Sequence, residues 1–326
     1  MMDNLPFIIA AATLIAWAFA ACGMWAKGNT HTHTNQSDGD SPPETAVEWY
    51  RGHGYNFLVI SDHNKVVDPA EISISSQDSF ILIPGEEITT FFGTRPVHVN
   101  SLGSTVAIQP ETGTTMPDTI QRNVDAVLAA GGLPEVNHPN FGYAFDERDM
   151  AQVRRFSLLE IYNGHPYVNN FGDADHLPVE QMWDVLLSSG RTIYGMAVDD
   201  THSFKTCVPS DANPGRGWVM VRVEKLTPGD VLNGLKNGDF YSSTGVELTD
   251  YSANSSEIRI SIRQSPGVTY STDFIGLHGK ILKQIDGPIA TYEFTGSKSE
   301  AYVRAKVIAS DGTVAWTQPV RASDEG

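Results

Sequence analysis

Short β-rich runs alternate with helical stretches along most of this chain, and this alternation constrains the fold more than any other feature. Helices are predicted over residues 43–52, 119–130, 179–189 and 228–236, where apolar residues recur at helical spacing and Ser, Pro or Gly mark the ends. Such alternation favours a barrel or a layered α/β domain. The predicted strands cover residues 29–34, 57–61, 80–83, 97–102, 133–137, 158–162, 192–198 and 218–223.

The helical signals stop after about residue 245. Residues 257–263, 290–294, 302–309 and 314–318 alternate apolar and polar side chains between turns rich in Gly, Asp and Ser. This pattern predicts a small C-terminal β-sandwich over residues 246–326, after a barrel-sized domain over residues 27–245. Because no low-complexity linker separates the two parts, we expect them to pack directly against each other.

The N-terminus carries an apolar stretch, residues 5–21, that ends in small residues. Residues 1–22 are therefore predicted to be a signal peptide or, with Cys22 as the lipidated residue, a lipoprotein signal. An uncleaved anchor remains an alternative, because the segment before the stretch contains Asp3 and no Lys or Arg. We expect an exported protein, periplasmic or extracellular, either soluble or tethered to the membrane. Without Cys22 only Cys207 is left, so no internal disulfide is expected.

The charge balance narrows the choice of partner. The 326 residues carry a net charge of -17, and no basic run is present. Nucleic acid is held by clustered Lys and Arg, so a nucleic-acid-binding surface is not expected. The charge leaves the function and the oligomeric state open.

Two short segments place potential metal ligands two residues apart. His31 and His33 would share one face of the first predicted strand, and Asp200 and His202 would share one face beyond residue 198. Divalent transition metals prefer imidazole and carboxylate ligands that converge on one point. One such pair is a weak signal, so its weight depends on the other residues of this kind in the chain.

Further histidines and acids fall where predicted strands end. They are His63, His98, His138, Asp38 and the neighbours Glu86 and Glu87. In α/β barrels the C-terminal ends of the strands form the active face. Any one of these histidines is more often an ordinary core or loop residue, but together the set predicts a metal centre.

The order of these motifs resembles that of the PHP (polymerase and histidinol phosphatase) family over residues 28–245. The segments that carry the resemblance are His31-x-His33, Ser37-Asp38-Gly39, Ser61-Asp62-His63-Asn64, Pro84-Gly85-Glu86-Glu87, His98, His138-Pro139 and Asp200-x-His202. The residues around His31 and the segment Ala315-Trp316-Thr317-Gln318-Pro319 resemble those of the CehA/McbA subgroup, which is named for a carbaryl hydrolase.

The resemblance implies a distorted (β/α)7 barrel of PHP type that binds two or three divalent metal ions, Zn, Mn or Fe. The implied ligands of the first ion are His31, His33, Glu87 and Asp200. Glu87 would bridge to a second ion held by His98 and His138, and a third ion would take Asp38, His63 and His202.

Two of these assignments choose between neighbouring acids. Glu87 is preferred to Glu86 because it is the second residue after glycine, as in the family. Asp200 is preferred to Asp199 because only Asp200 shares a face with His202. Asp199 is then expected to point away and to accept structural hydrogen bonds.

The implied reaction is hydrolysis of a phosphomonoester or phosphodiester by a metal-bound hydroxide, with no covalent enzyme intermediate. The catalytic residues would be Glu87, Asp200 and Arg95, and the partner a small-molecule substrate, a phosphate ester. A carbamate, ester or amide hydrolase using the same metals is the alternative, and the amidohydrolase superfamily also begins with His-x-His. A metal-stabilised extracellular binding module is the non-enzymatic alternative.

Other residues near the ligand segments have weaker claims. Lys65, Arg95, Arg148 and Lys205 could bind a substrate anion, although a cation in such a place is more often an ordinary surface charge. Arg95 is favoured because it lies three residues before His98. Asn64 and Asn140 are expected to orient ligands. His165 could line the cleft, whereas His53, His176 and His278 are expected to be ordinary residues.

Overall fold

The structure is a computed structural model that describes residues 23–72 and 79–321. The predicted export signal in residues 1–22 lies outside the described residues and stays a prediction. Within the described ranges, no helix has both the length and the apolar character needed to cross a membrane.

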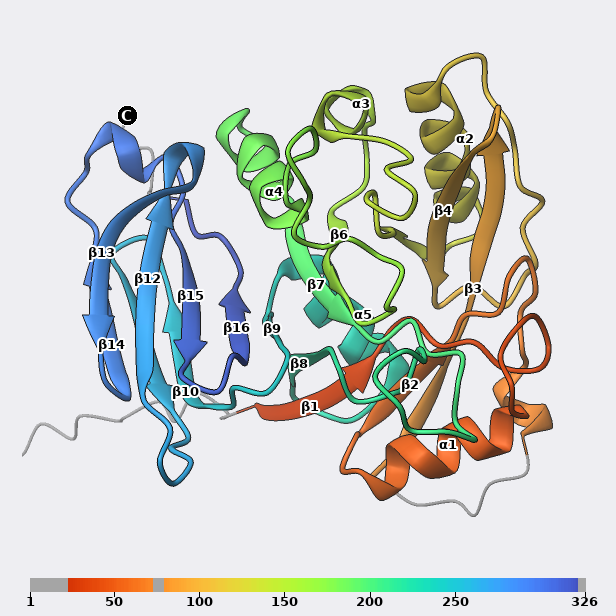
Figure 1. The fold of residues 1–326 in the computed structure, drawn as a ribbon, viewed down its shortest axis with the longest axis horizontal. Helices are drawn as coiled ribbons and strands as arrows, with labels where there is room; N and C mark the ends of the chain where they lie inside the picture. Colours follow the sequence, from red (N-terminus) through yellow and green to blue (C-terminus); the bar gives the residue numbers. More distant parts are fainter. Residues whose placement is uncertain (1–22, 73–78, 322–326) are drawn as a thin grey trace, which may run out of the picture.

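Seven strands lie side by side in chain order and surround the site described below (Figure 1). They are β1 (Met24–Asn29), β2 (Phe57–Ile60), β3 (Ile81–Phe92), β4 (Arg95–Leu102), β5 (Leu133–Val136), β6 (Leu158–Asn163) and β7 (Tyr194–Val198). Strands β1 to β3 and β5 to β7 run parallel, whereas β4 is antiparallel to both of its neighbours. Beyond the last residues of β1 and β7, a parallel bridge joins Thr32 to Thr201 and links the two ends of the series.

The helices follow local signals in the sequence. They are α1 (Pro43–Gly52), α2 (Met116–Ala129), α3 (Glu147–Gln152), α4 (Val179–Ser188) and α5 (Pro228–Asn237). Thr115 and Thr227 cap α2 and α5 by accepting a hydrogen bond from the third residue beyond them, and α5 stops at Gly238 in the left-handed region. The short α3, capped by Asp146, was not predicted.

The C-terminal part continues the same sheet. Beyond β1 the order is β8 (Trp218–Val223), β9 (Phe240–Ser243), β16 (Val314–Thr317), β15 (Arg304–Ala309), β12 (Tyr270–Gly276) and β13 (Lys280–Asp286). A second, antiparallel sheet holds β10 (Leu248–Ala253), β11 (Glu257–Ile262) and β14 (Ile289–Glu293). The mixed α/β class with a second small sheet is therefore confirmed. Because β16 pairs with β9, one sheet crosses the boundary expected near residue 245.

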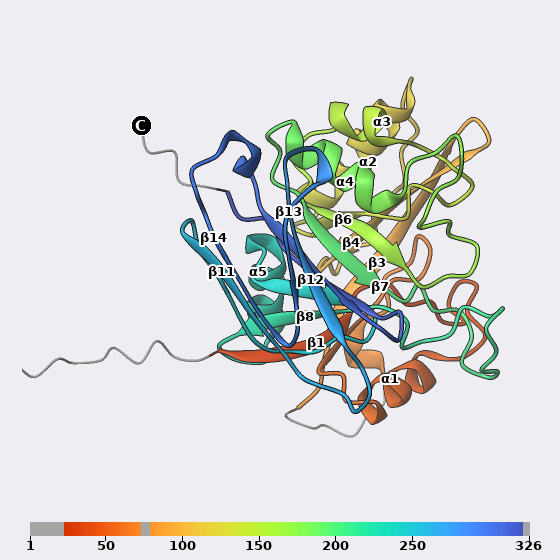
Figure 2. The same ribbon diagram turned by 60° about the vertical axis from the view of Figure 1, so that its left-hand side comes forward.

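Helix α4 lies beside the C-terminal strands in both views (Figures 1 and 2). Its Asp184 side chain receives two hydrogen bonds from Arg304 on β15, at 2.8 and 2.7 Å, and one from Tyr302 at 2.9 Å. All three side chains are buried. The two parts of the chain thus share a buried polar contact, in agreement with the expectation that they pack directly.

Candidate metal centre

The predicted ligands converge because most of them lie at the same edge of the sheet. His63, His138 and Asp200 follow the last residues of the parallel strands β2, β5 and β7 by two or three positions. His98 was expected at the end of a strand, but it is the fourth of the eight residues of β4. Its neighbour Val99 pairs with Val136, the last residue of β5, so the middle of the antiparallel β4 lies at the edge where β5 ends.

The predicted strand over residues 29–34 is wrong in position, because β1 ends at Asn29. The Asn29 side chain turns back and accepts a hydrogen bond from the His31 amide at 3.0 Å. His31 and His33 therefore lie just beyond the strand. The bridge between Thr32 and Thr201 keeps this segment in place, and the His33 amide donates to the Thr201 carbonyl at 2.8 Å. Asp200 likewise lies beyond β7, in the left-handed region with φ 51°.

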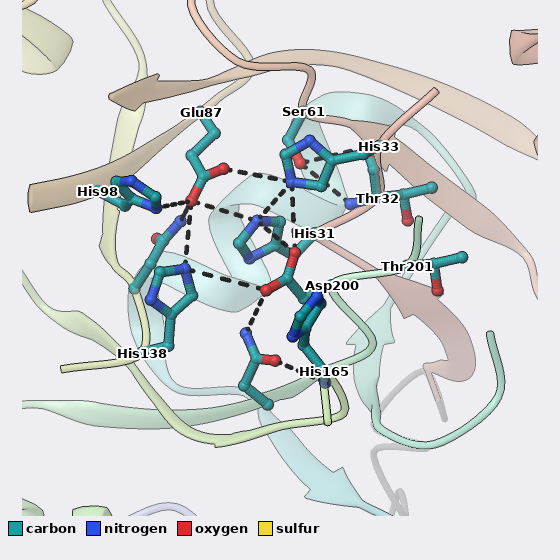
Figure 3. Close-up of polar contacts among 12 residues, drawn as sticks. His31, Thr32, His33, Ser61, Glu87, His98, His138, His165, Asp200 and Thr201 are labelled. Atoms are coloured by element: carbon teal, nitrogen blue, oxygen red, sulfur yellow. Dashed lines mark hydrogen bonds and ion pairs between the residues drawn. The ribbon is translucent and has the colours of Figure 1, made fainter. Parts of the chain in front are cut away.

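Glu87 lies at the centre of the cluster. Its Oε1 is 2.9 Å from His98 Nδ1, 3.4 Å from His31 Nε2 and 3.3 Å from His138 Nε2. Its Oε2 is 3.2 Å from His33 Nε2 and 2.9 Å from His63 Nδ1. Figure 3 shows the imidazoles of His31, His33, His98 and His138 arranged around this carboxylate. Glu87 is 1% exposed, so the contacts are shielded from water.

The structure brings all nine predicted ligands together in overlapping groups, and within each group the ligand atoms lie within 4.8 Å of one another. The groups are His31, His33 and Asp200; Glu87, His98 and His138; and His33, Asp38, His63 and His202. This grouping parallels the division among three ions that the family resemblance implies. His33 joins the third group in addition, and Asp38 is the exposed member of the set.

The donor atoms fit divalent cations. His31 Nε2 and His33 Nε2 face each other at 3.1 Å, and both lie close to Asp200 Oδ1, at 3.2 and 3.3 Å. His98 Nδ1 is buried and makes no hydrogen bond among the described residues, although it faces Glu87 Oε1 at 2.9 Å. Converging imidazole nitrogens and carboxylate oxygens are ligands that divalent transition metals bind.

The charges of the cluster depend on each other. Burial alone would raise the pKa of Glu87, but the imidazoles of His98, His31 and His63 outweigh it and hold that pKa well below its usual range. Burial alone would lower the pKa of His31, yet Asp200, Glu87 and Glu160 together raise it well above its usual value. The buried acids thus require positive charge beside them, which bound cations would also supply.

Glu160 on β6 belongs to this cluster and was not predicted. Its Oε1 is 2.5 Å from His31 Nδ1, and its Oε2 accepts from the His138 amide at 2.9 Å and from Asn163 Nδ2 at 3.0 Å. The contact fixes the His31 ring with Nε2 directed at the cluster. A sequence signal was present, since Glu160 is an acid inside the apolar run Leu158-Leu159-Glu160-Ile161.

Replacing Glu160 with glutamine should weaken metal binding by about 10- to 100-fold, because the acceptor that orients His31 loses its charge. Competition with a chromogenic chelator measures this change. Glu135→Gln is the matched control: Glu135 is also buried, but it accepts from Thr30 at 3.2 Å, and burial together with the Glu160 charge raises its pKa to about 8. Equal losses in the two variants would contradict this role of Glu160.

Both choices between neighbouring acids agree with the geometry. Side chains alternate along β3, so Glu86 points away from Glu87 and accepts from the Ile108 amide at 2.8 Å. Asp199 accepts from the Tyr50 hydroxyl at 2.7 Å and from the amides of Gly215 and Gly217 at 2.9 and 2.8 Å. Asp199 is thus a structural acceptor, as expected.

A cavity of about 220 Å³ opens above the cluster. Besides predicted ligands, its lining contains Phe141, His165 and Tyr167, and it contains no Lys or Arg of the described chain. His165 therefore does line the cleft. Burial lowers its pKa to about 4, so its imidazole is neutral near pH 7.

The cations expected to bind substrate lie elsewhere. Arg95 is exposed, lines a separate hollow with Tyr143 and Asp146, and does not border the cavity above the cluster. Its predicted catalytic role finds no support in this placement. Lys65 donates to Gln36, and Arg148 pairs with Asp146 at 2.6 Å.

The two asparagines differ from the expectation. Asn64 accepts from the Thr89 amide at 2.8 Å, and the Thr89 hydroxyl lies 2.6 Å from His63 Nδ1, so Asn64 acts on His63 only through Thr89. Asn140 donates to the carbonyls of Asn169 and Leu177, both at 3.0 Å. It therefore ties loops together and does not contact His138.

Comparisons with known proteins find distant structural likenesses. The sequence matches no family model and no curated protein. A two-domain protein from Bacteroides vulgatus containing a predicted PHP-like metal-dependent phosphoesterase superposes with a TM-score of 0.49 at 14% identity, covering 91% of this chain and 95% of that one.

Two shorter solved structures are also similar. A proposed metal-dependent phosphoesterase from Bifidobacterium adolescentis gives a TM-score of 0.41 at 16% identity, covering 64% of this chain and 94% of its own. An amidohydrolase from Chromobacterium violaceum gives 0.37 at 15% identity, covering 55% and 88%. Likenesses this distant carry no weight for function, which has to rest on the geometry of the site.

Proposed function

We propose that this protein is a metal-dependent hydrolase that cleaves phosphoesters at the Glu87 cluster. The observation that carries the proposal is the buried Glu87 carboxylate, whose two oxygens lie within 3.4 Å of nitrogens from five imidazoles. A buried carboxylate needs few partners for stability alone. Five imidazoles around one carboxylate, below an open cavity, are typical of a centre that holds more than one metal ion.

Different residues of the cluster have different roles in the proposed reaction. His31, His33 and Asp200 would hold one ion and His98 and His138 another, and Glu87 would be a ligand of both. Ions in these positions would supply Lewis acidity toward a substrate and a bound water. Asp200 Oδ2 accepts from Asn163 at 3.1 Å, which fixes its other oxygen toward His31 and His33.

His165 and Tyr167 stand at the cavity wall, where they can contact substrate. Nδ1 of the neutral His165 imidazole accepts from the Tyr167 amide at 3.2 Å, so Nε2 carries the proton and can donate one hydrogen bond to substrate. Phe141 adds an apolar surface beside the rings of His98 and His138, at centroid distances of 6.1 and 5.4 Å. These three side chains restrict water at the cluster and position the group that reacts.

A second candidate is hydrolysis of a carbamate, ester or amide at the same site. The observation that favours it is the lining of the cavity, which holds no Lys or Arg of the described chain. A phosphoryl group carries more negative charge than a carbamate does, so its charge would have to be met by the ions alone. The same ligand set serves both reactions.

The test is hydrolysis of an aryl phosphomonoester, an aryl phosphodiester and an aryl carbamate by the chain from residue 23, which keeps β1 complete. Each substrate is assayed with Mn, with Zn and with excess chelator. We expect turnover of a phosphate substrate that chelator abolishes and added metal restores. Turnover of the carbamate alone would establish the second candidate, and no turnover of any substrate would contradict both.

A further inference from the structure

A second and larger cavity, of about 690 Å³, lies between β6 and α4 on one side and the C-terminal strands on the other. The geometry points to this cavity as the subsite for an apolar, non-reacting arm of the substrate, an aryl or bulky alkyl group joined to the ester cleaved at the Glu87 cluster. This inference rests on the proposed function and adds the substrate class to it.

One segment, residues 163–171, borders both cavities. His165 lines the cavity above the cluster and the larger one, whereas Pro166, Val168 and Phe171 line only the larger one. His165 is thus the side chain that both cavities share, and the inferred arm would extend past it from the cluster into the larger cavity. Figure 3 places His165 beside Asp200, at the edge of the ligand group.

Hydrogen bonds hold this segment in shape. The Asn163 amide donates to Asn170 Oδ1 at 2.9 Å, and Asn170 Nδ2 donates back to the Asn163 carbonyl at 2.8 Å. The Gly164 amide donates to the Val198 carbonyl at 2.9 Å, and Phe141 and Val168 form an antiparallel bridge. The wall between the cavities is thus formed before any ligand arrives, which lowers the entropic cost of binding.

The opposite wall comes from alternation along the C-terminal strands. On β15, Ala305 and Val307 pack into the core between the two C-terminal sheets, whereas Lys306 and Ile308 face the cavity. On β16, Ala315 joins that core, and its neighbours Val314 and Trp316 line the cavity. The sheet thus presents aliphatic and aromatic side chains on the face turned toward α4.

The cavity wall holds three carboxylates, Glu180, Asp184 and Asp273, and three cations, Arg216, Arg304 and Lys306. Arg304 contacts Asp184 at 2.7 Å and Glu180 at 3.0 Å, and Lys306 contacts Glu180 at 2.5 Å. Arg216 donates to the Gly164 carbonyl at 3.0 Å, and Asp273 accepts from Gln284 at 2.7 Å. Among the described residues Arg304 Nη1 is buried without a hydrogen-bond partner. Because the carboxylates offset the cations, the wall does not select an ion, and an uncharged, largely apolar group is the best match.

The size and the rim agree with this class of ligand. Sites for drug-sized molecules span about 300–1,000 Å³ and are lined mainly by apolar side chains. At the rim, Phe171 and Ile281 are 79% and 52% exposed, so large apolar side chains face solvent where a ligand would enter. A biphenyl or similar group has dimensions that suit such a cavity.

The test fills the cavity and compares a long with a short substrate. Phenyl and 4-biphenylyl members of the ester class that the protein hydrolyses share a leaving group of similar acidity but differ in length. Ile308→Trp should lower kcat/KM for the biphenylyl ester by more than about tenfold and change the phenyl ester by less than about twofold. Ile308→Phe adds less volume to the cavity. If Ile308→Trp fails to fold, the same comparison of the two esters is made with Ile308→Phe.

Ile289→Trp is the matched control, because Ile289 on β14 is 68% exposed and lies outside the cavity lining. Equal effects of Ile308→Trp on the two esters, or no effect on either, would overturn the inference. If the unmodified protein cleaved neither ester with any metal, the proposed function would fail instead.

A binding measurement without turnover separates these two failures. The fluorescence of 8-anilinonaphthalene-1-sulfonate, with chelator present, should rise with the unmodified protein and with Ile289→Trp, and much less with Ile308→Trp. Equal binding by all three proteins would show that the cavity takes no apolar group.

Discussion

Glu87→Gln should reduce turnover by at least about a thousandfold, the upper range for loss of one preorganised electrostatic group. The substitution keeps the size of the side chain but removes the negative charge shared by five imidazoles. Without that charge no carboxylate can bridge two cations between His31 and His98. Activity assays with added metal and metal analysis of the purified variant measure the two effects together.

The neighbouring acid offers a sharp control. Glu86 is as buried as Glu87, but its Oε1 accepts from the Ile108 amide and it lies outside every ligand group. Glu86→Gln should therefore keep metal content and leave turnover within a few-fold. If Glu87→Gln retained its full metal content and rate, the assignment of the cluster would be wrong.

The second large effect concerns stability. Asp184→Asn should lower the free energy of unfolding by about 3 kcal/mol, because it leaves the buried Arg304 guanidinium without its main counter-charge. Arg304 is 1% exposed and Asp184 5%. Glu180, 3.0 Å from Arg304, remains and places the loss at the lower end of the range for a broken buried pair. Urea unfolding followed by circular dichroism measures the change.

Glu257→Gln is the control for this experiment. It breaks an ion pair with Arg259, whose side chain is 61% exposed, so the loss should stay below about 1 kcal/mol. Similar losses in the two variants would mean that the contact between α4 and β15 contributes no more than a surface pair. In that case the pairing of β9 with β16 and apolar packing would hold the C-terminal strands to the rest of the chain.

Local patterns account for much of the fold. The helix predicted over residues 43–52 coincides with α1, and the strand over 218–223 coincides with β8. Prolines, cap residues and apolar spacing act within a few positions, so they are readable along the chain. Strands β9, β10, β12 and β13 were missed. β9 is short and β13 has few buried residues, so neither carries the usual signal.

The candidate site, like the fold, could be predicted from the sequence only in part. Residue type and motif order identified nine potential ligands, because metal chemistry restricts which side chains can serve. The resemblance supplied their grouping, which the distances parallel. Arg95 was chosen only for its closeness in sequence to His98. Arg95 is the exposed first residue of β4, and its side chain does not border the cavity above the cluster.

The alternation of strands and helices, most helix positions and the kinds of side chain at the site can thus be predicted from local signals along the chain. Three other features depend on how distant segments pack: Glu160 reaches His31, one sheet runs through both parts of the chain, and His165 borders two cavities. Local preferences depend on neighbours a few residues away. These contacts join segments far apart in the chain, such as Thr32 and Thr201, and exist only once the strands have paired.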